Sequence, residues 1–192
     1  MKKAVLLVGV LAAGVGLAGC GGSTEGEARP SGGVTSSAAT GSGLAVDVPT
    51  SYNPCTDVPE SVLSSERLVK GVADNKANAD GPDGIKWRGC RWVQSNGYAV
   101  SIQVTNMTIP FVREHYFNDV RELAIAGRPA ITARRSDTRS SEVCSINVEM
   151  RGGTLEFHLD NPPSRRETGR IDTCQLGLVL AEKVVPTLPT GA

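Results

Sequence analysis

The sequence from Cys144 to Asp160 reads CSINVEMRGGTLEFHLD and predicts the central element of the fold. Apolar and polar residues alternate over 144–150 and again over 154–160, which is the period of a strand with one buried face. Arg151-Gly152-Gly153 between the two runs predicts a tight turn. We therefore expect an antiparallel hairpin in which His158 lies on the face opposite the buried Leu and Phe residues and is exposed to solvent.

The segments around this hairpin predict more strands and two terminal helices. Ser95-Asn96-Gly97 between two β-rich runs indicates a second hairpin. The expected segments are a helix at 59–66 capped by Thr56 or Asp57, a loop at 74–84, strands at 90–93 and 98–105, a short helix or turn at 109–117 with Phe111, Tyr116 and Phe117 as apolar anchors, strands at 120–126 and 130–134, and a helix from Asp172 to Pro186. We expect an α+β fold: an antiparallel sheet with an N-terminal and a C-terminal helix packed on one side, and two disulfides.

The N-terminus has the pattern of an export signal. Lys2 and Lys3 precede an apolar run from Ala4 to Ala18 that contains no acidic residue, so residues 1–19 are expected to be a signal peptide. The run is shorter than the roughly 20 residues of a membrane-spanning helix. Leu17-Ala18-Gly19-Cys20 resembles the bacterial lipobox, which implies cleavage before Cys20 and a lipid on its thiol. The alternative is a free thiol after an ordinary cleavage site.

The mature chain divides into a tether and one domain. Residues 21–49 hold seven Gly, five Ser and three Thr, so residues 20–49 are expected to be the lipidated Cys and a flexible linker. Residues 50–192 are expected to be a single α+β domain. This domain has as many basic as acidic residues, which argues against binding of nucleic acid. The arginines near Arg134 and Arg165 are interpreted as solvated loop residues, with contact to a phosphate or an anionic lipid as the alternative.

Four cysteines remain once Cys20 is set aside, an even number that predicts two disulfides in an oxidising compartment. Counting leaves three pairings open, and the spacing favours Cys55 with Cys90 and Cys144 with Cys174. A zinc site would need paired Cys or His ligands close in sequence, and none of the four has such a neighbour. We expect no metal and no cofactor.

The ordered motifs resemble a known family. They are Asn53-Pro54-Cys55, Cys90-Arg91-Trp92, Gly127-Arg128-Pro129-Ala130, Cys144, Asp172-Thr173-Cys174 and Leu188-Pro189. Together they resemble the actinobacterial lipoproteins grouped as domain of unknown function 3558, over essentially all of 51–189. The resemblance implies an envelope lipoprotein with two disulfides, and it supplies no reaction, ligand or catalytic residue.

No catalytic residues are predicted. The sequence has no Gly-x-Ser-x-Gly elbow, phosphate-binding glycine loop or His-Glu-x-x-His motif, and we expect that the protein is not an enzyme. Two carboxylate pairs, Asp57 with Glu60 and Glu149 with Glu156, are interpreted as solvent-facing charges. Trp92 is expected in the core, whereas Trp87 could be in the core or stack on a sugar.

The expected function is a non-catalytic binding or accessory module of the cell envelope. It would be held on the extracytoplasmic face of the cell membrane by the lipid on Cys20, with an envelope protein as its partner. The alternative is a carrier of a lipid or another apolar ligand, which would need an apolar cavity of a few hundred Å³. Cavity volume and lining therefore discriminate between the two hypotheses.

Overall fold

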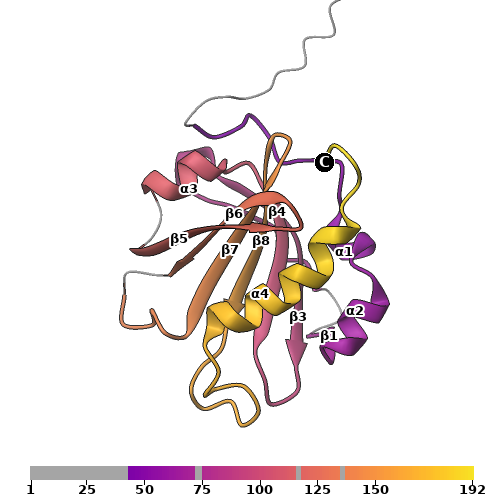
Figure 1. Ribbon diagram of the computed structural model, residues 1–192, viewed down its shortest axis with the longest axis vertical. Helices are drawn as coiled ribbons and strands as arrows, with labels where there is room; N and C mark the ends of the chain where they lie inside the picture. The colour runs from indigo at the N-terminus through magenta and orange to yellow at the C-terminus, as the bar shows by residue number, and fades with distance from the viewer. Residues whose placement is uncertain (1–42, 72–74, 116–117, 135–136) are drawn as a thin grey trace, which may run out of the picture. The chain divides into compact units, whose positions relative to one another are not determined.

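The computed structural model describes residues 43–71, 75–115, 118–134 and 137–192. Its centre is an eight-stranded antiparallel sheet of order β1-β3-β4-β8-β7-β6-β5, with β2 also paired to β3 (Figure 1). The strands are β1 Leu68–Lys70, β2 Ala79–Asp80, β3 Lys86–Gln94, β4 Ala99–Thr105, β5 Asn118–Ile125, β6 Arg128–Arg134, β7 Val143–Met150 and β8 Gly153–Asp160. The helices are α1 Pro54–Asp57, α2 Glu60–Ser65, α3 Ile109–His115 and α4 Thr173–Val184, with short 3-10 turns η1 Pro82–Gly84 and η2 Val185–Thr187.

The hairpin of β7 and β8 has the predicted register. Pairing runs from Val143 opposite Asp160 to Met150 opposite Gly153. Gly152 and Gly153 have φ angles of 83° and 153°, a region that favours glycine, and this explains the glycine pair at the turn. β8 also pairs along its length with β4, so the two predicted hairpins meet at the middle of the sheet.

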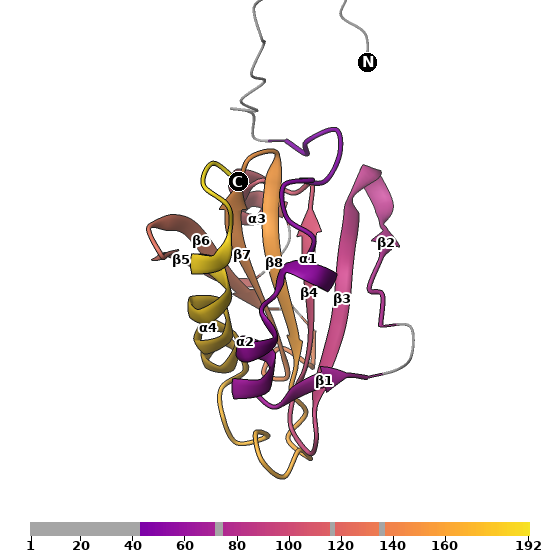
Figure 2. The ribbon, with the colours of Figure 1, turned by 90° about the vertical axis from the view of Figure 1, so that its right-hand side faces the viewer.

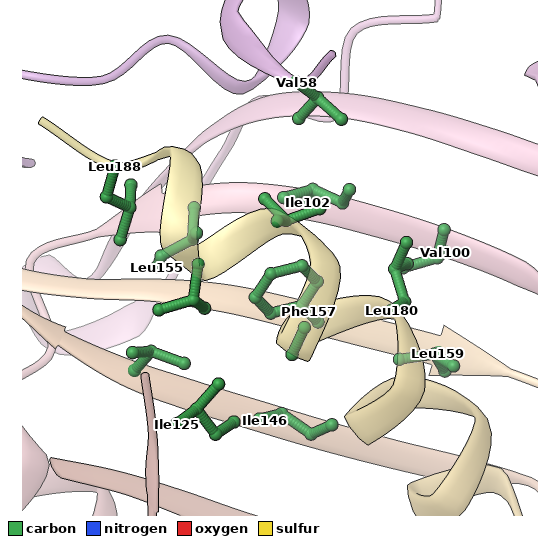
Figure 3. Close-up of a cluster of buried hydrophobic side chains, with 14 of the residues drawn as sticks. Val58, Val100, Ile102, Ile125, Ile146, Leu155, Phe157, Leu159, Leu180 and Leu188 are labelled. Carbon is green, nitrogen blue, oxygen red and sulfur yellow. The ribbon is translucent and has the colours of Figure 1, made fainter. Parts of the chain in front are cut away.

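Helix α4 covers one face of the sheet. Asp172 caps this helix by accepting a hydrogen bond from the Gln175 amide at 3.0 Å. A Cβ on Gly177 would lie 2.6 Å from Ile146 Cδ1, so glycine at this position allows α4 to approach β7 closely. Leu180 is fully buried here with Phe157. Figure 3 shows these apolar side chains gathered between α4 and the strands.

Helices α1 and α2 lie on the same side as α4 (Figure 2). They correct the single helix expected at 59–66. The Asn53 side chain caps α1 by accepting from the Cys55 amide, and Asp57 accepts from the Asn53 amide. Pro59 precedes the first residue of α2 and has extended backbone, so the helix begins again after it. The fold class is therefore confirmed, with two short N-terminal helices in place of one.

Helix α3 belongs to a separate, smaller apolar cluster. Ile109 and Val112 from this helix pack with Ile85, Met107 and Ile131. Because Ile131 alternates with the α4-facing Ala130 along β6, this cluster lies on the sheet face away from α4. Phe111, an expected anchor, is half-buried and stacks on the His115 ring at 4.5 Å. Tyr116 and Phe117 lie outside the described residues.

Two short strands were missed. β1 has one buried residue in three and β2 has none, so neither shows the alternation that predicts a strand. β2 falls inside the loop expected at 74–84. Both form because the long edge of β3 offers unpaired backbone groups.

Part of the expected tether is packed on the domain. The Ala45 amide donates to the Asn106 carbonyl at 2.8 Å, and Leu44 forms an isolated bridge with Met107. Pro49 is buried. The end of the expected tether at 43–49 therefore packs with the domain. In the part of the chain that the structure describes, no helix is long and apolar enough to cross a membrane.

Candidate functional site

The sheet face away from α4 carries a group of polar side chains at its centre. They come from the three adjacent strands β4, β8 and β7. Their register arranges them in two rows, Ser101–His158–Ser145 and Gln103–Glu156–Asn147. We call these six residues the polar cluster.

The polar cluster is buried, although alternation alone predicts that this face is exposed. Asn147 is fully buried and Glu156 is only 3% exposed. His158 is half-buried, which corrects the expectation that it is exposed. Its side chain lies on a central strand between two neighbours, and its Nδ1 atom is 2.9 Å from Ser145 Oγ.

Long-range hydrogen bonds hold the cluster. The Trp87 indole donates from Nε1 to Glu156 Oε2 at 2.7 Å, across β4. The Gln103 side-chain amide donates to the Ala77 carbonyl. Gly89 lies opposite Gln103 on β3 and has no side chain to block this hydrogen bond. Thr154 Oγ1 donates to Asn147 Oδ1 at 3.0 Å.

Two members of the cluster have unmet requirements. Asn147 Nδ2 is buried and has no acceptor among the described residues. Glu156 forms no ion pair with any residue that the structure describes. A buried carboxylate without a cation and a buried N–H without an acceptor each cost free energy. Tyr52 Oη and Gln94 Oε1 are also buried without a partner among the described residues, so Asn147 Nδ2 is one of three such atoms. Buried groups of this kind are uncommon in folded proteins, and functional sites are one place where they occur.

The Ser145–His158 pair does not have the geometry of an accessible nucleophile. Ser145 is 1% exposed, and it sits within a regular strand rather than on a sharp turn. Among the described residues, His158 forms no hydrogen bond to an acidic side chain.

The disulfides join the cysteines that the spacing favoured. Cys55 pairs with Cys90, and Cys144 pairs with Cys174. The first bridge ties α1 to β3 and the second ties α4 to β7. The predicted lipidation site, Cys20, lies outside the described residues. Within the described ranges no group of three or more potential metal ligands is present.

The other residues singled out in the sequence fall into separate places. Trp92 is in the core at 2% exposure, as expected, and Trp87 is half-buried beside the polar cluster. Asp57 serves as a helix cap and does not contact Glu60. Glu149 is exposed and lies opposite Thr154 in the β7–β8 pair. Glu156, two residues after Thr154 on β8, is buried and lies opposite Asn147. The interpretation as solvent-facing charges thus holds for Glu149 and is wrong for Glu156.

Two pockets lie elsewhere on the described surface. The first has a volume of about 450 Å³ and lies between residues 48–55 and β3, with Lys76, Asn78 and Arg88 in its wall. The second, about 260 Å³, lies near the start of α4. Arg134 lines it and is bonded to Asp172 at 2.5 Å, so this arginine is a half-buried strand residue and not part of a solvated loop.

The fold and its bridges define a disulfide-bonded α+β domain of the kind found outside the cytoplasm. The family model described as "Protein of unknown function (DUF3558)" matches residues 15–187, and the chain belongs to this family. No curated protein matches the chain. No solved structure matches it.

Proposed function

We propose that this chain is a lipid-anchored, non-catalytic binding module on the extracytoplasmic face of a membrane, and that the polar cluster holds its ligand. The observation that carries the proposal is the buried Asn147 Nδ2 atom, which has no acceptor among the described residues, next to Glu156, a buried carboxylate that forms no ion pair with them. A ligand that accepts a hydrogen bond from Asn147 Nδ2 would meet this requirement and gain free energy.

The compartment is supported by the cysteines. Two disulfides persist in an oxidising environment and are rare in the cytosol. The lipobox-like residues before Cys20 support a lipid anchor on the same side of the membrane. Two or more acyl chains give stable membrane attachment, whereas one chain gives marginal attachment.

The alternative of an apolar carrier has less support. Its requirement was an apolar cavity, and the face under α4 is filled by side chains such as Ile102, Phe157 and Leu180, each fully buried (Figure 3). The two pockets described above have charged residues in their walls.

The test is native mass spectrometry of the exported protein purified from a bacterium that expresses it. We expect a co-purifying polar molecule with the unaltered chain and its loss in Glu156→Gln. Glu60→Gln makes the same chemical change on exposed α2 and serves as the matched control. A lipid that stays bound to all three proteins would contradict the proposal and favour the carrier. The absence of any ligand from the unaltered chain would also count against it.

A further inference from the structure

The larger pocket lies on the sheet face that carries α1, away from the polar cluster, and it does not depend on the function proposed above. Its volume of about 450 Å³ is in the range of sites that take small molecules. The segment 48–55 forms one wall and β3 the other, and the Cys55–Cys90 disulfide joins the two. Its lining includes the exposed residues Thr50 and Lys76, so the pocket is open to solvent. The pocket therefore offers a ligand both room and access.

Two asparagines present hydrogen-bond donors to this pocket. Asn78 Oδ1 accepts from the Gly89 amide at 3.0 Å, and Asn53 Oδ1 accepts from the Cys55 amide at 3.1 Å. These bonds fix which way each side-chain amide is turned, because the oxygen is the atom that must face the backbone N–H. Each Nδ2 group is then left as a donor at the pocket wall.

Two cations, Lys76 and Arg88, belong to the same lining. Arg88 Nη1 donates to the Ala79 and Trp87 carbonyls at 2.8 and 2.7 Å, which holds the guanidinium in place. Its Nη2 pairs with Asp80 at 2.6 Å, but Asp80 is not part of the lining. None of the described residues that line the pocket is acidic. Donors and cations together favour a ligand group that only accepts hydrogen bonds and carries negative charge.

The remaining lining is mostly apolar. Val48, Pro49 and Pro54 come from the N-terminal wall, and the buried residues Tyr52 and Val104 complete it. A wholly apolar ligand would cover the donors without accepting from them, which costs free energy. An inorganic anion would leave the apolar surface in contact with water.

We propose that this pocket binds an amphipathic anion. A carboxylate or phosphate head group accepts hydrogen bonds from the asparagine and cationic side chains, and an apolar chain packs against the Val104 side of the pocket. This ligand differs from that of an apolar carrier, because the charged head group is required for binding.

The test is an NMR titration that follows the Gly89 backbone amide and the Asn78 Nδ2 signal, the latter assigned by its loss in Asn78→Asp. The probes are octanoate, octyl phosphate, octan-1-ol and inorganic phosphate at constant ionic strength. We expect a saturable shift with octanoate or octyl phosphate. Octan-1-ol and inorganic phosphate should each bind at least about tenfold more weakly, because each lacks one half of the ligand. The tighter of the two amphipathic probes identifies the head group.

Asn78→Asp is the sharpest variant. It keeps the oxygen that bonds to the Gly89 amide and replaces the donor with negative charge, so it should weaken binding of the amphipathic anion about tenfold or more. Asn96→Asp makes the same change at the exposed turn between β3 and β4 and should bind like the unaltered chain. Should Asn78→Asp fail to fold, Lys76→Gln removes a cation at an exposed position and gives the same expected loss.

Four results would overturn the proposal. Equal affinity for octan-1-ol and octanoate would show a purely apolar pocket. Equal affinity for inorganic phosphate and octyl phosphate would show a site for simple anions. The other two are the absence of a saturable shift with either amphipathic probe, and equal affinity in the unaltered chain and a folded Asn78→Asp or Lys76→Gln variant.

Discussion

At the scale of single residues, Gly89 explains how the polar cluster can form. It lies opposite Gln103 in the β3–β4 pair, and a Cβ on it would come within 2.1 Å of the Ile102 carbonyl oxygen. Gly89→Ala is expected to lower the free energy of unfolding by about 2–3 kcal/mol, since the clash is with backbone that cannot move aside. Urea denaturation measures the change. Gly43→Ala, where a Cβ would meet nothing within 4 Å, should change stability by less than about 0.5 kcal/mol, and equal losses in both variants would contradict this reading.

Two buried tyrosines predict how stability depends on alkaline pH. Burial raises the pKa of Tyr98 above its usual 10.0, with the nearby Glu66 charge adding to the shift, and burial also raises the pKa of Tyr52. Because the folded state holds these protons more tightly, their contribution is fully present below about pH 10 and is lost as the pH rises further. The urea midpoint should therefore fall above about pH 10. Tyr98→Phe should show a shallower decline, and parallel curves for the two proteins would be evidence against it.

At the scale of elements, the second disulfide fixes the longest helix to the sheet. Cys174 lies in the first turn of α4 and Cys144 lies in the buried part of β7. Replacing both by Ala should cost roughly 2–5 kcal/mol, the range found when a native disulfide is removed from a small exported domain. Urea denaturation of the double variant measures the cost. Peptide mapping of the non-reduced protein is the independent check, because finding Cys174 joined to Cys55 or Cys90 would refute the pairing.

The sequence predicted well the elements that depend on residues close together in the chain. The alternation in β7 and β8 and the glycine turn between them are visible in consecutive residues, and their register follows. The site was harder to predict. Burial of a polar strand face depends on which distant segments cover it, and the indole of Trp87 reaches Glu156 from 69 positions away. The sequence does show polar residues at alternate positions of both strands, which places them on one face of the sheet. This pattern cannot tell whether that face is exposed to solvent or buried.

At the scale of the whole molecule, the two faces of the sheet differ in kind. The face under α1, α2 and α4 is an apolar core closed by two disulfides. The opposite face has the polar cluster at its centre. The α3 cluster on this face draws residues from both sides of those strands, such as Trp87 on β3 and Ile131 on β6. Residues 43–49 run along the same domain, where the Ala45 amide bonds to the Asn106 carbonyl and Leu44 forms a bridge with Met107. The domain thus combines a large apolar core on one face of the sheet with a buried polar cluster on the other.

The anchor is a prediction about the whole molecule, because it determines where this surface acts. Cys20→Ser should abolish acylation, since only a thiol forms the thioether that the lipobox-like residues imply. Loss of the acyl chains removes about 0.8 kcal/mol of membrane affinity per buried methylene, so the variant should shift from the membrane fraction to the released fraction. Labelling with radioactive palmitate and cell fractionation measure both effects. Cys55→Ser together with Cys90→Ser is the control, because it removes two cysteines but should keep the label. Palmitate retained on Cys20→Ser would show that the lipid is elsewhere or that the label is not an anchor.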